Sequence, residues 1–377
     1  MAFIDVHILQ AVPPSNINRD DTGSPKTAVF GGVRRARVSS QAWKRATRRR
    51  FNATLNRSDI GYRTKQIVEL LVDEIRSIDT SIELPDAELA ASNAFGSAGI
   101  KVTKPRPAKN APEDDVGMSE AGYLVFLSTN QFHKLAELAI AAHRAGAKIG
   151  SKEAKAAINS DHSFDVALFG RMVADDAELS VDAAAQVAHA ISVHAVEPEF
   201  DYYTAIDDLK EEDKETGAGM IGTVEFNSST LYRYATVSVH GLRANLGDDA
   251  ATARATAAFV ESLALSMPTG KQNSFANRTV PDAILVSVRA DQPVNLVGAF
   301  ENPVQLGAET STVRTAVREL VKRDKEVASA YGAPSYRWYV SVGDAVEPLE
   351  GHGDRVSVSE LVDQLETHVL GLLGESL

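Results

Sequence analysis

A run of basic residues near the N-terminus is the part of this sequence best suited to binding chemistry. Between Thr22 and Ser58 there are ten lysines and arginines and no aspartate or glutamate, although the formal net charge of the chain is -12. Charge segregation of this kind concentrates positive potential on one surface, whose commonest partner is a phosphate backbone. A solvated helix face is the alternative, and charge alone does not decide between the two.

A helix is expected inside this run, and it would arrange the charges. Ser39 or Ser40 suits an N-cap, and residues 41–51 read as a helix with apolar residues on its buried side. Like charges four residues apart repel each other unless an anion lies across them, and free N–H groups at a helix start also favour an anion. The two expected cationic rows are Lys44 with Arg48, and Arg45 with Arg49. The pattern therefore predicts an anion-binding surface.

Four longer motifs resemble a known family. They are NRDD at 18–21, KTAVFGGVRRARVSSQAWKRA at 26–46, ALFGRM at 167–172 and FDYYTAIDDL at 200–209. In this order they resemble the CasC family, the repeated backbone subunit of type I-E CRISPR surveillance complexes called Cascade. The resemblance covers nearly the whole chain. It implies a hand-shaped subunit without catalytic activity that binds guide RNA.

Composition bounds the class of protein. With 377 residues, of which 44% are apolar and 24% charged, the chain is typical of a globular protein with a large core or two to three structural units. It has no cysteine, which is compatible with a reducing cytoplasm. The start of the sequence lacks the pattern of a signal peptide, and no long apolar span occurs. We expect a cytoplasmic protein without a membrane partner.

Strand and helix patterns alternate in a way that predicts an α+β fold. Residues 3–10 alternate with Ile4, Val6 and Ile8 on one side, and residues 33–38 form a second strand. The last third predicts strands at 234–242, 283–290 and 337–342 and helices at 250–267, 311–330 and 359–373. This order suggests a ferredoxin-like or RRM-like sheet with helices on one face.

The resemblance divides this fold into the parts of a hand. An RRM-like palm would comprise residues 1–58 and 183–377, and the helical pattern of 59–182 would form inserted fingers. A thumb would extend over residues 197–227, with nine acidic residues between Glu197 and Glu215. From the residues alone this is an acidic β-hairpin arm whose tyrosines pack locally. The resemblance instead implies an arm that lies over the guide RNA and docks on the next copy, with Tyr202 and Tyr203 near displaced bases.

The residues predicted to bind RNA come from several segments. A loop around Gly270 could also hold a phosphate. A lone Gly-Lys pair is weak evidence, however, and an ordinary exposed loop is the more common explanation of such a pair. Met172 is included because the resemblance implies it. The full set is Arg19, Lys26, Ser39, Ser40, Gln41, Lys44, Arg45, Arg48, Arg49, Met172, Tyr202, Tyr203, Lys271 and Asn273.

Catalysis has little support in the sequence. None of the HExxH, GxxxxGK[ST] and GxSxG motifs occurs. Asp20-Asp21 and Asp207-Asp208 could help to hold a divalent ion, but solvation or pairing with a nearby arginine such as Arg19 explains them adequately. We expect no cofactor, no metal site and no catalytic residue. A metal-dependent ribonuclease of a related CRISPR effector and a generic single-strand RNA-binding protein stay open as alternatives.

The expected partners follow from the resemblance. They are a CRISPR guide RNA, further copies of this chain, other Cascade subunits, and target DNA paired with the guide.

Overall fold

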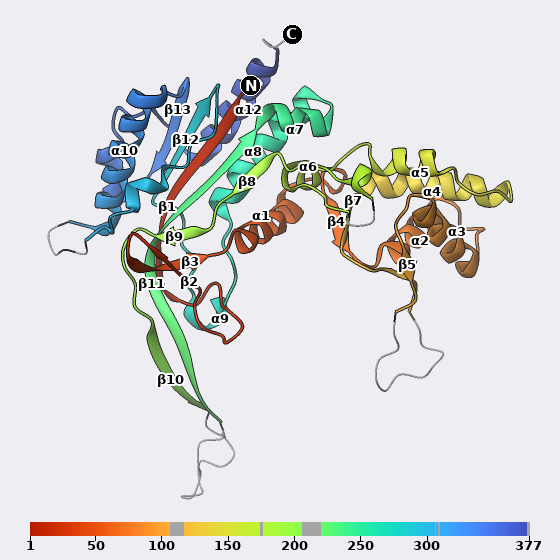
Figure 1. The fold of residues 1–377 in the computed structure, drawn as a ribbon, viewed down its shortest axis with the longest axis horizontal. Coiled ribbons are helices and arrows are strands. Elements are labelled where there is room, and N and C mark those ends of the chain that lie inside the picture. The colour runs from red at the N-terminus through yellow and green to blue at the C-terminus, as the bar shows by residue number, and fades with distance from the viewer. Residues whose placement is uncertain (106–116, 174–175, 206–219, 306, 308–309, 375–377) are drawn as a thin grey trace, which may run out of the picture. The chain divides into compact units, whose positions relative to one another are not determined.

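The computed structural model describes residues 1–105, 117–173, 176–205, 220–305, 307 and 310–374 (Figure 1). The chain divides into two compact units. The first comprises Met1–Arg50, Gln186–Val239 and Ala253–Leu377, and the second comprises Phe51–Ala185 and His240–Thr252. The assignment of these parts as palm, fingers and thumb stays a prediction.

The first unit is built on a mixed sheet in which β1 (Phe3–Ser15) is central. β1 pairs antiparallel with β11 (Met220–Ser238) on one side and with β12 (Ala283–Arg289) on the other. The strand order is β14-β13-β12-β1-β11-β9-β3-β2, and β8 and β10 pair with β11. The other strands of this sheet are β2 (Thr27–Phe30), β3 (Val33–Val38), β8 (Ala185–Val187), β9 (Ala190–Ser192), β10 (Glu199–Ala205), β13 (Tyr336–Ser341) and β14 (Asp354–Arg355).

Helices cover both faces of this sheet. Leu9 of β1 belongs to one apolar core with Leu320 of α10 (Thr312–Tyr331), so α10 packs on the face that carries the odd-numbered residues of β1. On the opposite face, Trp338 donates a hydrogen bond of 2.9 Å from Nε1 to Oε1 of Gln364 in α12 (Val358–Gly374). The α+β class is confirmed, but the expectation of helices on one face is wrong.

The two-sided cover explains the composition of β1. Ile4, Val6 and Ile8 are buried as the alternation predicts, but Asp5 and His7 on the other side are buried too. An alternating strand normally predicts one solvated face. Here the polar residues lie beneath α10, where partners within the protein replace water.

The long strand β11 corrects a predicted boundary. The sequence pattern places a strand at 234–242, whereas β11 ends at Ser238 and α7 (Val239–Leu246) begins directly after it. Ser238 pairs with Phe3, the first residue of β1, so β11 has no partner beyond that point. At its other end, residues 220–226 of β11 pair with β10 as a two-stranded ribbon.

The second unit contains a helical core with two small sheets. β4 (Gly61–Thr64) pairs with β7 (Val125–Ser128), and β5 (Val102–Thr103) pairs with β6 (Glu120–Ala121). Ser128 and Gln131 form a capping box at the start of α4 (Thr129–Arg144). The helices of this unit are α2 (Ile67–Ile78), α3 (Leu84–Ser97), α4 (Thr129–Arg144), α5 (Ser151–Ile158), α6 (Phe164–Phe169) and α7.

The remaining helices are α1 (Ser40–Thr54), α8 (Asp249–Leu265), α9 (Gln272–Phe275) and α11 (Val346–Leu349). Among the described residues, no helix combines the length and apolar character needed to cross a membrane.

Candidate nucleic-acid interface

The segment that follows β1 is held in place by two asparagines. Asn16 is buried, and its Nδ2 donates hydrogen bonds to the carbonyl oxygens of Gly23 at 3.0 Å and Glu225 at 2.9 Å. Asn18 accepts hydrogen bonds from the backbone N–H of Ser39 at 2.8 Å, through Oδ1, and of Lys26 at 2.9 Å, through its carbonyl. Asn18 of the NRDD motif therefore fixes the start of α1 and the start of β2, and Asn16, two residues before it, fixes the base of the β10–β11 ribbon.

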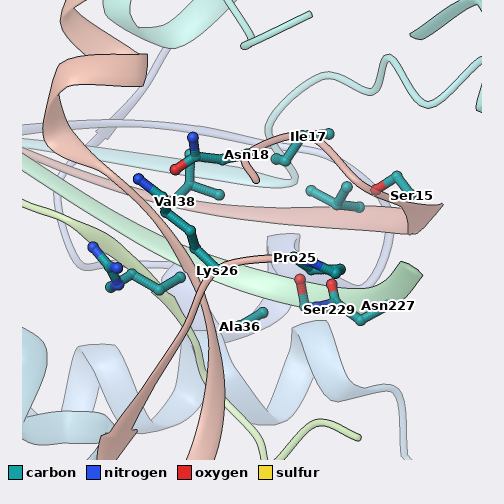
Figure 2. A pocket seen from close by; sticks show the side chains of 11 residues that line it. Ser15, Ile17, Asn18, Pro25, Lys26, Ala36, Val38, Asn227 and Ser229 are labelled. Atoms are coloured by element: carbon teal, nitrogen blue, oxygen red, sulfur yellow. The ribbon is translucent and has the colours of Figure 1, made fainter. Parts of the chain in front are cut away.

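A small pocket lies between these segments (Figure 2). Two cationic side chains, Lys26 and Arg37, line it together with neutral residues and without any carboxylate. The neutral residues are Val12, Ser15, Ile17, Asn18, Pro25, Ala36, Val38, Asn227 and Ser229. Hydrogen-bond donors with unbalanced positive charge suit an anion.

The carboxylate of Asp20 accepts hydrogen bonds from the turn that follows it. Its Oδ1 accepts hydrogen bonds from Oγ1 of Thr22 at 2.7 Å and from the backbone N–H groups of Thr22 and Ser24, both at 3.0 Å. The hydrogen bond from the Thr22 hydroxyl is the largest cause that lowers the pKa of Asp20. These hydrogen bonds hold the loop in shape, and this role accounts for an aspartate at position 20 without a metal ion. In the described part of the chain, no group of three or more His, Asp or Glu side chains is arranged to hold a metal.

The start of α1 confirms the predicted N-cap. Ser39 is buried, and its carbonyl accepts hydrogen bonds from the N–H groups of Ala42 at 3.0 Å and Trp43 at 3.3 Å. Its hydroxyl lies 3.4 Å from the N–H of Ala42, so part of its hydrogen-bonding capacity serves the helix. Ser40 is half-buried and Gln41 is exposed.

The two cationic rows of α1 differ in exposure. Arg45 and Arg49 are exposed, whereas Lys44 and Arg48 are half-buried. Burial lowers the pKa of Lys44. Because a solvated guanidinium reaches a ligand without moving its neighbours, the Arg45–Arg49 row is the more accessible of the two.

Other arginines of the basic run have structural roles. Arg35 is fully buried, and it donates hydrogen bonds to the carbonyl oxygens of Phe300 at 2.8 Å, Ser192 at 3.0 Å and Phe30 at 3.2 Å. Arg50 forms an ion pair of 3.0 Å with Glu261. The sequence pattern counts these residues with the basic surface, but their side chains hold elements together.

The loop before α9 packs directly on the segment after β1. A Cβ atom on Gly270 would lie 2.4 Å from the carbonyl oxygen of Ile17, so only glycine permits this approach. Lys271 follows it with a positive φ of 50° and is half-buried, and Asn273 is exposed on α9. The predicted loop thus adjoins the basic segment, which the sequence separation of the two did not reveal.

The tyrosine pair of β10 does not act as one surface. Adjacent residues of a strand point to opposite faces, so Tyr202 and Tyr203 lie on different sides of the ribbon. Tyr203, which is 39% exposed, lies beside Gly222 of the paired strand. Phe200 and Tyr202, at 65% and 64% exposure, share one face instead. The predicted acidic thumb residues 207–215 lie outside the described part of the chain.

Met172 belongs to the second unit and is 83% exposed. The preceding Arg171 is buried and donates hydrogen bonds to the carbonyl oxygen of Leu179 at 2.7 Å and to Oδ1 of Asn159 at 2.8 Å. Burial lowers the pKa of Arg171 to about 10. The FGRM motif therefore presents an apolar side chain on a segment whose arginine is anchored within its own unit.

Sequence reasoning missed three residues with features of a binding surface. Phe200 was detectable from the i,i+2 pattern of aromatic residues with Tyr202. Arg37 lies in the basic run but is not among the residues predicted to bind RNA, and no sequence pattern indicates His189 as part of a binding surface. In the structure Arg37 and His189 contact each other, and His189 also accepts a hydrogen bond from the backbone N–H of Ser40 at the start of α1.

The whole chain is similar to known proteins. A family model described as CT1975-like protein matches residues 4–364. One similar solved chain, from a "CRISPR RNA-guided surveillance complex, pre-nicking", is 32% identical with a TM-score of 0.83 and covers 97% of this chain and 100% of its own. Another, from a "CRISPR RNA-guided surveillance complex", is 27% identical with a TM-score of 0.74 and covers 97% and 99%. Among curated proteins, no sequence matches.

Proposed function

Because this chain belongs to the CT1975-like protein family, we propose that it is a scaffold subunit that binds the guide RNA of a CRISPR surveillance complex. The surface around the start of α1 is the observation that carries this proposal. There, exposed Arg45 and Arg49 belong to the same unit as the Lys26–Arg37 pocket. The likeness to chains of RNA-guided complexes over nearly the full length of both chains supports it.

The chemistry of this surface suits a scaffold that accepts any guide sequence. Guanidinium and ammonium groups bind phosphates without reading bases. Specificity then depends on pairing between guide and target, as in other RNA-guided systems. In this proposal Arg19, Lys26, Lys271 and the α1 cations bind phosphates, while Tyr202, Phe200 and Met172 lie near bases.

The finer features of the proposal extend the resemblance to the CasC family. The chain would belong to a type I-E Cascade, polymerise head to tail along the RNA in the cytoplasm, and present the guide to target DNA without catalysing a reaction. Its palm would be RRM-like, with RNA held by added segments rather than on an open sheet.

Removing the exposed cationic row tests the proposal. In the full chain, Arg45→Ala with Arg49→Ala should reduce the slope of log affinity for single-stranded RNA against log salt by about 1.4, since each lost phosphate contact contributes about 0.7. Fluorescence anisotropy with a labelled RNA across a salt series measures this slope.

A matched control lies on α10, where Arg318 and Lys322 are exposed at the same i,i+4 spacing. Arg318→Ala with Lys322→Ala removes the same charge and should leave the slope unchanged. Equal losses in both double variants would show that net charge alone attracts RNA and would contradict a specific interface. Circular dichroism checks that both variants stay folded.

A further inference from the structure

Arg37 is held in a defined position by two acceptors. Its Nε donates a hydrogen bond of 3.1 Å to the carbonyl oxygen of Thr27, and its Nη1 lies 3.3 Å from Nδ1 of His189. The backbone N–H of Arg37 also bonds to the carbonyl of Lys26 at 2.9 Å. Within the described part of the chain, its Nη2 has no hydrogen-bond partner. One edge of the guanidinium is therefore fixed while the other retains donors for a ligand.

His189 holds two elements together through a single nitrogen. Its Nδ1 faces the guanidinium of Arg37 and, at 3.3 Å, the backbone N–H of Ser40, the first residue of α1. Both groups are donors only, so Nδ1 must be the unprotonated acceptor and the neutral ring carries its proton on Nε2. Burial, followed by the charges of Arg37 and Lys26, lowers the pKa of His189, which favours this neutral form.

The surroundings of Arg37 select an anionic ligand. Arg37 and Lys26 line the same pocket, whose other residues are apolar or neutral polar. Two neighbouring cations repel each other unless an anion lies between or across them. Lys26 lines this pocket with Arg37, and Ser40 adjoins Arg37 through the shared acceptor His189, so an RNA backbone that passes along these residues would place successive phosphates near them.

We propose that Arg37 is a further phosphate-binding residue of this interface and that His189 is the residue that positions its guanidinium. The inference rests on the proposed RNA-binding function and extends it to two residues on β3 and the β8–β9 turn. His189 does not touch the phosphate in this proposal. Its Nδ1 accepts hydrogen bonds from Arg37 and from the backbone N–H of Ser40, and it thereby fixes the position of both.

The salt dependence of RNA binding tests the role of Arg37. In the full chain, with a labelled single-stranded RNA of mixed sequence, Arg37→Ala should lower the slope of log affinity against log salt by about 0.7. Arg37→Lys keeps the charge and should keep the slope. Arg34 is the matched control, because it is exposed on the same strand and three positions away, on the opposite face. Arg34→Ala should leave the slope at the wild-type value.

Two substitutions of His189 distinguish a role in positioning Arg37 from a role in the stability of the fold. His189→Ala removes the acceptor and should weaken RNA binding by about two- to tenfold, the range expected for one hydrogen bond. His189→Asn places an amide oxygen near the position of Nδ1 and should restore most of the affinity. Thermal unfolding followed by circular dichroism identifies any variant that fails to fold.

Four results are decisive. An unchanged slope in folded Arg37→Ala, or a slope that falls as much in Arg34→Ala, would overturn the role of Arg37. Equal binding by His189→Asn and His189→Ala would overturn the role of His189. If the wild-type chain binds RNA without salt dependence, the proposed function itself fails. This failure can be told apart from a failure of the inference about Arg37 and His189, because it is seen in the wild type before any variant is compared.

Discussion

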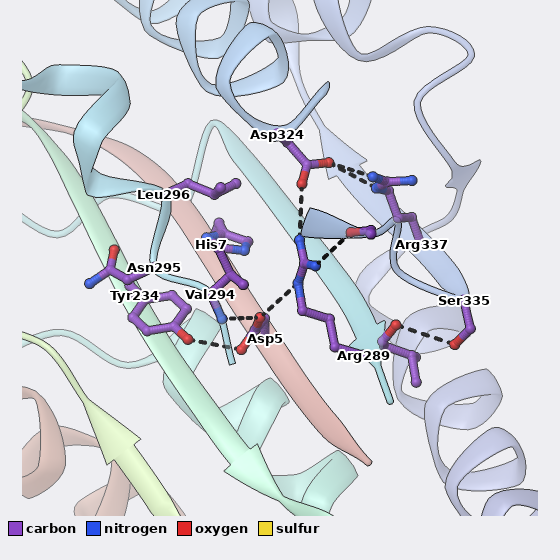
Figure 3. A network of polar contacts seen from close by, with 12 residues as sticks. Asp5, His7, Tyr234, Arg289, Val294, Asn295, Leu296, Asp324, Ser335 and Arg337 are labelled. Atoms are coloured by element: carbon purple, nitrogen blue, oxygen red, sulfur yellow. Dashed lines mark hydrogen bonds and ion pairs between the residues drawn. The ribbon is translucent and has the colours of Figure 1, made fainter. Parts of the chain in front are cut away.

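At the scale of single residues, a buried ionic network shows how polar groups are accommodated inside the first unit (Figure 3). Asp324 of α10 accepts hydrogen bonds from Arg337 at 2.9 Å and His352 at 2.8 Å, and it lies 3.5 Å from Nη2 of Arg289. Asp5 accepts from the hydroxyl of Tyr234 at 2.9 Å. Burial opposes the charge of Asp324, but the hydrogen bond from His352 and the charge of Arg337 hold its pKa below the ordinary range. These partners explain why charged residues occupy a core.

His7 in this region makes stability depend on pH. Burial lowers the pKa of His7 to about 3, whereas an unfolded histidine titrates near pH 6.5. The neutral form is therefore favoured in the folded state, so the stabilisation is complete above pH 6.5 and is lost as pH falls toward the folded-state pKa. Between pH 6.5 and the folded-state pKa, the protonation of His7 in the unfolded state should reduce the free energy of unfolding by about 1.4 kcal/mol for each unit by which the pH falls.

Denaturant unfolding of the wild type and His7→Asn at pH 7.0, 6.0, 5.0 and 4.5 measures this contribution. The variant cannot titrate at this position, so its curve of unfolding free energy against pH should be flatter than that of the wild type. Parallel curves would show that His7 is not kept neutral by burial.

At the scale of elements, the turn between β2 and β3 is a tight contact. A Cβ on Gly31 would lie 1.6 Å from the carbonyl oxygen of Glu301, while a Cβ on Gly32 would meet nothing within 4 Å. Both glycines have positive φ, at 60° and 78°. The Phe30-Gly31-Gly32 turn thus packs the β2–β3 hairpin against Glu301, directly after η3 (Leu296–Phe300), and Arg35 also donates a hydrogen bond of 3.3 Å to the carbonyl oxygen of Glu301.

This pair of glycines provides a matched comparison. Gly32→Ala should cost about 1 kcal/mol of unfolding free energy from backbone strain alone, whereas Gly31→Ala should cost at least about 2 kcal/mol more because the hairpin must move. Chemical denaturation of both variants measures the difference. Equal losses would mean that the hairpin does not need this close approach.

Local sequence patterns identified most elements but not their partners. Ser39 as N-cap, the helix after it and the strand at 33–38 follow from residue types a few positions apart. By contrast, the end of β11 depends on where β1 begins, and the separation of Tyr202 from Tyr203 depends on the alternation of a paired strand. The charge count also treated Arg35 as surface, because no local signal shows that four backbone carbonyls surround it.

At the scale of the whole molecule, the α+β class was predictable and the layering was not. Periodicity reports which side of an element is apolar, but β1 carries apolar residues on one side and buried Asp5 and His7 on the other. Only the cover provided by α10 and its ionic partners distinguishes this arrangement from a solvated face. Of the candidate interface, the basic residues came from charge counting, whereas the contact of Gly270 with the segment after β1 required the fold.

The RNA that accompanies the protein tests the central claim most directly. The chain should be purified with its co-expressed complex partners, and the bound RNA should be extracted and sequenced. A scaffold predicts a discrete species that carries CRISPR repeat and spacer sequence and stays intact along the spacer. Heterogeneous cellular RNA would contradict the guide-binding role, and target RNA cut at regular steps in Mg²⁺ would contradict a non-catalytic one.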